Sequence, residues 1–186
     1  MAELPADEPE RIRALTAHLG LPGIIDVHSH FMPQRMLDKV WAYFDRIEPR
    51  TGVAWPIAYR LPQEERLARL RSFGVRAFTS LSYPHKPGMA QWLNAWSADF
   101  ADAHADCLRS ATFYPEEGAG AYVRKAVEAG TQVFKAHVQV GDYDPHDPLL
   151  DEVWGCLQES RTPVVIHAGH GPERGRFTGP EGMASL

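Results

Sequence analysis

Three polar residues near the start of the chain, Asp26, His28 and His30, are spaced by two. Asp26 lies within a short β-branched run that is typical of a strand, His28 ends this run and His30 follows it. On an extended strand, residues at this spacing project from one side, so the two imidazoles can face a common centre. Neutral imidazole readily binds zinc and its first-row neighbours. The spacing indicates a divalent-metal site, with Asp26 one step deeper, where its carboxylate can orient a ligand imidazole.

Other apolar runs also end in polar groups. Lys135 and His137 are again spaced by two, and Val164-Val165-Ile166 runs directly into His167. A single histidine in a strand is more often a hydrogen-bonded core or rim residue than a ligand. Several histidines at the same end of parallel strands are instead typical of a site. We therefore expect a metal site there, with His137 contacting the metal or the substrate.

The elements that must position these residues alternate along the chain. Apolar strand patterns occupy residues 24–28, 75–81, 108–114, 132–138 and 163–167, and amphipathic helix patterns occupy 7–19, 34–44, 63–73, 89–105, 119–129 and 149–159. Such alternation predicts a parallel α/β sheet. An open sheet would carry a glycine-rich loop after its first strand, whereas this chain has His28-Ser29-His30. That difference favours a (β/α)8 TIM-barrel-type fold, incomplete, with about five βα units present.

The overall composition excludes several classes of function. The 186 residues carry a net charge of −5, with no basic cluster for nucleic acid and no apolar run long enough to span a membrane. The first twenty residues are rich in charge and show no export signal, so we expect a cytoplasmic protein with a small-molecule substrate. Cys107 and Cys156 are expected to be core residues. Residues 48–61, with Trp55 and Tyr59, form a long connection that predicts either an aromatic lid or a packing flap.

Three segments together resemble the amidohydrolase superfamily, in its amidohydrolase-related branch and over its N-terminal portion only. They are Ile24-Ile25-Asp26-Val27-His28-Ser29-His30-Phe31-Met32-Pro33, Phe134-Lys135-Ala136-His137 and Pro163-Val164-Val165-Ile166-His167-Ala168-Gly169. The resemblance implies that His28, His30 and His167 bind one divalent metal ion, zinc before iron or manganese. Some members carboxylate a lysine at the region of Lys135 to bridge two metals; we expect Lys135 to contact the substrate or the metal shell instead. The family's later histidine and aspartate have no counterpart before Leu186, so the acid–base residue is not identified.

These observations lead to three hypotheses about function. The first is a metal-dependent hydrolase acting on a small-molecule C–N or C–O bond. The second keeps the scaffold and the ligands but is a non-oxidative decarboxylase, and the third is a truncated, inactive fragment that at most binds metal. We expect an N-terminal helical extension over residues 1–22 and a partial barrel over 23–186. Because five strands do not close a barrel, we also expect self-association through open sheet edges.

Overall fold

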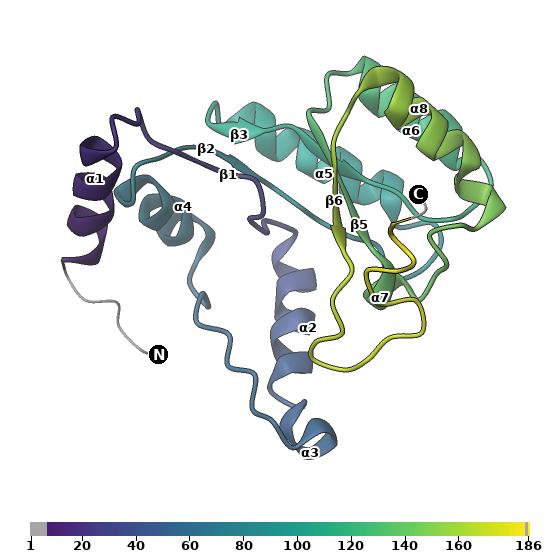
Figure 1. Ribbon diagram of the computed structural model, residues 1–186, viewed down its shortest axis with the longest axis horizontal. Helices are drawn as coiled ribbons and strands as arrows, with labels where there is room; N and C mark the ends of the chain where they lie inside the picture. Colours follow the sequence, from purple (N-terminus) through teal and green to yellow (C-terminus); the bar gives the residue numbers. More distant parts are fainter. Residues whose placement is uncertain (1–6, 185) are drawn as a thin grey trace. The chain divides into compact units, whose positions relative to one another are not determined.

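The computed structural model describes residues 7–184 and 186, and it divides into two compact units (Figure 1). The first unit comprises the described part of Met1–Ser29 together with Gln34–Phe78. The second comprises His30–Pro33 and the described part of Thr79–Leu186. The first six residues of the expected N-terminal extension lie outside the described residues. Each unit is considered by itself below.

The described part of the first unit contains four helices and a pair of parallel strands. Its elements are α1 (Glu8–His18), β1 (Ile24–Asp26), α2 (Gln34–Phe44), α3 (Glu48–Thr51), α4 (Gln63–Ser72) and β2 (Val75–Thr79), whose last residue belongs to the second unit. β1 pairs with β2 in parallel, with Ile25 opposite Ala77 and Asp26 opposite Phe78. Gly74, which separates α4 from β2, has a φ of 82°, a conformation that glycine adopts without strain. Glycine in this position is a common stop signal at the end of a helix.

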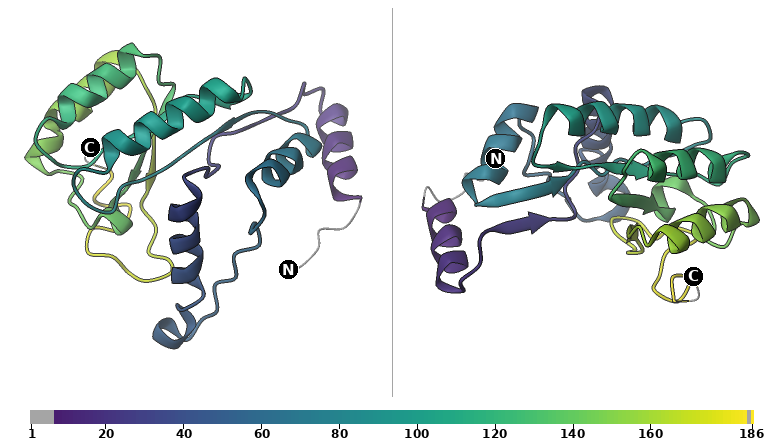
Figure 2. Two further views of the ribbon diagram at one scale, coloured as in Figure 1. Left: turned by 180° about the vertical axis from the view of Figure 1, so that it is seen from behind. Right: turned by 90° about the horizontal axis from the view of Figure 1, so that it is seen from above.

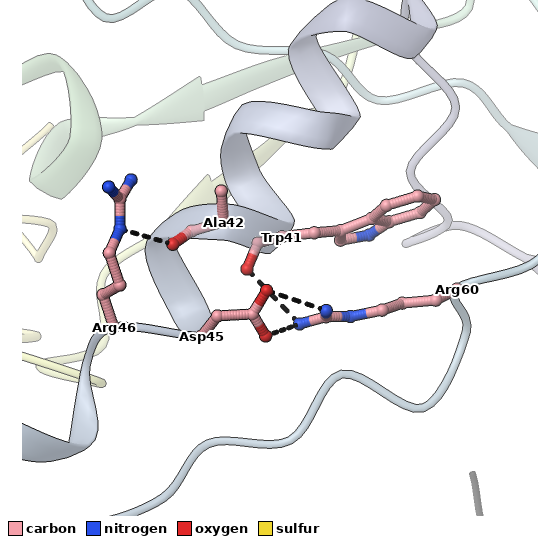
Figure 3. A network of polar contacts seen from close by, with 5 residues as sticks. All are labelled: Trp41, Ala42, Asp45, Arg46 and Arg60. Carbon is pink, nitrogen blue, oxygen red and sulfur yellow. Dashed lines mark hydrogen bonds and ion pairs between the residues drawn. The ribbon is translucent and has the colours of Figure 1, made fainter.

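Hydrogen bonds from Arg60 hold the connection between α2 and α4 against the C-terminal end of α2. Arg60 donates from Nη1 to Asp45 Oδ2 at 3.0 Å and from Nη2 to Asp45 Oδ1 at 2.5 Å (Figure 3). Its Nη2 also donates to the Trp41 carbonyl at 3.3 Å. This fork geometry matches a carboxylate, and the guanidinium lowers the pKa of Asp45 below its ordinary value through that hydrogen bond. The far end of the predicted irregular segment is therefore anchored, whereas Trp55 within it is exposed.

The second unit is built on a parallel sheet of β4 (Ser110–Thr112), β5 (Val133–His137) and β6 (Val164–His167), in that order. The other elements are α5 (Ala90–Ala103), β3 (Cys107–Leu108), α6 (Ala119–Glu128), α7 (Val138–Gly141), η1 (Pro148–Leu150) and α8 (Asp151–Ser160). Helices α5, α6 and α8 lie on the same side of this sheet (Figures 1 and 2). Such one-sided cover is what right-handed βαβ crossovers produce.

The two faces of the β4–β5–β6 sheet differ sharply in chemistry. The face beneath the helices is apolar: Ala111, Phe113, Phe134 and Ala136 form one buried core with α6 and α8, and Val164 and Ile166 pack against it. Because side chains alternate along a strand, the intervening residues occupy the other face. These are Ser110, Thr112, Val133, Lys135, His137, Val165 and His167. The second face is therefore lined mainly by polar groups, and it is the face on which chemistry can occur.

The predicted α/β alternation is confirmed, with differences in detail, among them the short helix α3 within the connection expected over residues 48–61. The first strand ends at Asp26 rather than His28, because the Asp26 carboxylate accepts a hydrogen bond from the His28 backbone N–H and turns the chain. The third predicted strand is split into β3 and β4 on either side of Arg109. Helix α7 was not predicted, since it begins directly at the end of β5. Among the described residues, no helix combines the length and apolar character needed to cross a membrane.

Candidate active site

His137 and His167 lie side by side at the ends of adjacent strands. They are direct partners in the parallel register of β5 and β6. Their rings stack with centroids 4.1 Å apart and planes 16° apart. The His137 side chain is 9% exposed, and the Nε2 atom of His167 is buried. Hence the predicted convergence of strand-end histidines is observed for this pair.

Tyr83 and His30 extend the cluster. The Tyr83 ring lies 4.5 Å from the His137 ring, centroid to centroid, and 5.6 Å from the His30 ring, which it meets edge to face. Tyr83 comes four residues after β2, in the segment that follows the strand. The second unit thus gathers four aromatic rings, His30, Tyr83, His137 and His167, from four parts of the sequence.

Two contacts position His30: a hydrogen bond made by its own ring, and the packing of Phe31, the next residue in the chain. Its Nδ1 lies 2.9 Å from the Leu81 carbonyl oxygen. Since a carbonyl can only accept, Nδ1 carries the proton and the neutral ring has its lone pair on Nε2. Phe31, 1% exposed, stacks on Phe100 of α5 at 5.2 Å and 23°. The backbone carrying His30 is thereby packed against the helix layer.

A network of buried hydroxyl groups holds the segment that supports His30. The Ser80 backbone N–H donates to Ser110 Oγ at 3.2 Å, and Ser97 Oγ donates to the Ser80 carbonyl at 3.4 Å. Thr112 Oγ1 donates to the Lys135 carbonyl at 2.8 Å. Buried polar groups that are paired in this way fix a unique arrangement of the backbone. These hydrogen bonds hold in place the segment whose Leu81 carbonyl accepts from His30.

Lys135 is the most deeply buried charged residue in the core, with 0% of its surface exposed. Burial lowers the pKa of its ammonium group from 10.5 to about 8, because the charged form loses hydration. Lys135 shares the polar sheet face with His137, as the spacing of two predicts. A lysine with this pKa is still mostly charged at pH 7 and becomes mostly neutral above about pH 8.

His137 has a second structural task, which the sequence did not indicate. Its Nδ1 accepts a hydrogen bond from the Val140 backbone N–H at 3.3 Å, so that the side chain caps α7. Gly141 closes this short helix beneath the Tyr143 ring, and the Tyr114 hydroxyl donates to its carbonyl at 3.0 Å. The loop after β5 is therefore built around the His137 ring.

The remaining predicted site residues, Asp26 and His28, belong to the first unit. The Asp26 Oδ1 accepts from the His28 backbone N–H at 2.9 Å, and the His28 side chain is exposed. Asp26 thus orients the backbone of His28, and its predicted role toward a ligand imidazole stays a prediction. Across residues 7–184 and 186, no three His, Cys, Asp or Glu side chains form a group that could hold a metal ion. The structure accordingly brings together His30, His137 and His167, with Tyr83 between His30 and His137.

Sequence reasoning assigned no role to Tyr83, Leu81 or Phe100. The only available signal was the polar end of the second strand, Ser80 to Tyr83. A backbone carbonyl such as that of Leu81 leaves no trace in residue types, and Phe100 appears as one apolar position of a helix. These supporting contacts are visible only once the strand ends are folded together.

Comparison with known proteins agrees with this architecture. Residues 25–186 match the amidohydrolase family, and the chain belongs to it. Members of this family generally use divalent metal ions. No curated protein matches the sequence.

A solved structure shows the same fold. An uncharacterized TIM-barrel protein from Bordetella bronchiseptica superposes with a TM-score of 0.63 at 16% sequence identity. The alignment covers 88% of this chain and 62% of that protein, so the chain spans less than two thirds of its length. The fold is therefore of the TIM-barrel type, and the described residues supply five of its strand positions, β3 and β4 together forming the third.

Proposed function

We propose that this chain carries the metal-binding portion of a metal-dependent hydrolase that cleaves a C–N or C–O bond in a small molecule. The observation that carries the proposal is the state of His30. Its Nδ1–H donates to the Leu81 carbonyl, which leaves Nε2 as an electron-pair donor. Metal-binding histidines almost always direct their other ring nitrogen to such an acceptor. Membership of the amidohydrolase family supports the same conclusion.

The residue types of the proposed ligands suit a divalent metal. The residues that would hold it are His28, His30 and His167. All three offer imidazole nitrogens, which bind zinc more readily than they bind calcium or magnesium. Iron and manganese share this preference to a lesser degree. When bound, such an ion lowers the pKa of a bound water molecule and polarises a carbonyl group. The chain's own contribution is to fix the His30 imidazole, through the Leu81 carbonyl and the Ser80–Ser110 contact beside it.

The polar sheet face provides the groups that would contact the substrate. Lys135 and His137 share this face with His167, and both are largely or fully buried. A buried lysine and a buried imidazole favour a substrate with a negatively charged or strongly polar oxygen. The same groups would suit decarboxylation of a carboxylic acid. Screening the chain for carbon dioxide release against amide, ester and lactone hydrolysis separates the two reactions.

Metal analysis tests the proposal directly. The purified chain, after exposure to zinc and removal of free ion, is expected to retain about one equivalent or less. Changing His28 and His30 together to Ala should abolish retention, because two of three ligands are lost. His18→Ala in α1 is the matched control and should retain zinc like the parent. Equal zinc in the double variant and the parent would refute the ligand assignment.

A further inference from the structure

We infer that His137 is the site's hydrogen-bond donor and not a metal ligand: its Nε2–H binds an anionic oxygen, such as a carboxylate, of the substrate. This inference rests on the proposed function, which it deepens by naming the class of substrate group that the site accepts. It assigns opposite roles to two histidines of one cluster. His30 offers a lone pair at Nε2, and His137 offers a proton at the same ring position.

Backbone groups dictate both tautomers. The Leu81 carbonyl can only accept, so it requires a proton on His30 Nδ1 at 2.9 Å. The Val140 N–H can only donate, so it requires a lone pair on His137 Nδ1 at 3.3 Å. In the neutral ring the proton of His137 therefore resides on Nε2. A ring that carries its proton on Nε2 has no lone pair there to give to a metal.

The neighbours of His137 fix the direction of that donor. Its ring lies between the Tyr83 ring at 4.5 Å and the His167 ring at 4.1 Å. Rotation of the ring about its Cβ–Cγ bond would break the Val140 hydrogen bond and both ring contacts. The donor is thus held in place before any ligand arrives, which reduces the entropy cost of binding.

The charge of the surrounding face favours an anion. The residues that β4, β5 and β6 place on this face are Ser110, Thr112, Val133, Lys135, His137, Val165 and His167, and none of them is acidic. Lys135 is the one residue of this set with an ordinarily cationic side chain. A carboxylate is the ligand group that a fixed N–H donor and a nearby ammonium bind best. A cationic substrate group would find no counter-charge on these strands.

The tautomers can be read without metal and without a variant. In the metal-free chain labelled with ¹⁵N, long-range ¹H–¹⁵N correlation spectra distinguish protonated from unprotonated ring nitrogens. We expect protonated Nδ1 in His30 and protonated Nε2 in His137. A His137 ring protonated on Nδ1 alone would overturn the inference. The result is independent of whether the chain binds zinc.

Two conservative variants separate the two tasks of His137. His137→Asn retains an acceptor near the position of Nδ1 and can cap α7, but it has no donor at the Nε2 position. His137→Gln places an amide N–H near the Nε2 position. With acetate as the probe and the metal-free chain, we expect the Gln variant to bind within a few-fold of the parent. The Asn variant should bind at least about tenfold more weakly, as expected for loss of a hydrogen bond to a charged group.

Zinc content completes the test. Both variants should retain as much zinc as the parent, since His137 is not a ligand. Loss of zinc in both would identify His137 as a ligand and overturn the inference, as would equal acetate binding by the Asn variant and the parent. Absence of a saturable acetate response at His137 in the parent would overturn it too. If the parent retains no zinc while the tautomers and acetate binding are as expected, the metal proposal fails and the donor assignment stands.

Discussion

Replacing Lys135 by Met should make the chain more stable and flatten its dependence on pH. Lys135 is 0% exposed, and burial lowers its pKa from 10.5 to about 8. Below about pH 8 the ammonium is charged in both the folded and the unfolded chain, so folding carries the full cost of burying the charge. A difference of about 2.5 pKa units corresponds to about 3 kcal/mol. Lys135→Met removes this cost, and we expect a gain of about 2 to 3 kcal/mol near neutral pH.

The pH dependence has a definite sign. Between the two pKa values the folded chain has released the proton and the unfolded chain still holds it, so the free energy of unfolding rises with pH. From about pH 7 to about pH 9.5 the Lys135 contribution amounts to about 2 kcal/mol. Burial raises the pKa of Cys107 to about 11, which lowers stability at the upper end of this range. That effect is common to the parent and the variant and cancels in their difference.

Urea denaturation at several pH values measures both effects. The matched control is Lys125→Met on the exposed side of α6, which removes a lysine without changing the buried site. Parallel series with and without bicarbonate test carboxylation of Lys135, which would convert the amine into an anion and remove the rise with pH. We expect bicarbonate to change neither the rise nor the metal content. A stability difference between the variant and the parent that does not change across this pH range would refute the reasoning.

Three further variants test the loop packing and the anchored connection. Gly141→Ala would place its Cβ 2.5 Å from the Tyr143 ring, so thermal melting should show a loss of about 1 to 3 kcal/mol. Gly155→Ala in α8 meets nothing within 4 Å and should instead gain about 0.5 to 1 kcal/mol; a loss there would contradict the packing described for α8. Arg60→Ala removes the fork to Asp45, and limited digestion with the unspecific protease proteinase K should cut residues 53–59 faster while the melting temperature barely changes. An unchanged cleavage rate would show that Arg60 does not anchor this connection.

Much of the fold could be predicted because its signals are local. The alternation of helix and strand patterns identified α2 as residues 34–44, the bounds that the structure has. The stop at Gly74 was equally clear, since only glycine adopts its positive φ without strain. The exact end of β1 was not predictable in this way. It depends on a hydrogen bond from the His28 N–H to the Asp26 carboxylate, and both residues also fit an extended strand.

The candidate site was predictable as a set of residues but not as an arrangement. Spacing placed Lys135 and His137 on one face, and in the structure Phe134 and Ala136, which alternate with them, join the core on the other face. Spacing did not distinguish a ligand imidazole from a donor imidazole. That distinction depends on which backbone group each ring meets, the Leu81 carbonyl or the Val140 N–H. Such partners are set by tertiary structure and carry no signature in the sequence.

The stacking of Phe31 on Phe100 has a consequence for mutagenesis of this protein. Phe100 also stacks with Trp96 at 5.1 Å and lies 4.5 Å from the His104 ring, so one side chain of α5 joins the backbone of His30 to the surface of the helix layer. Random libraries screened for loss of the proposed zinc binding should therefore recover changes at Phe100, on a helix that contains no candidate site residue. A redesign of the outer helices for higher stability must therefore keep an aromatic residue at position 100. Without it, the packing of Phe31 and the position of His30 would be less well fixed.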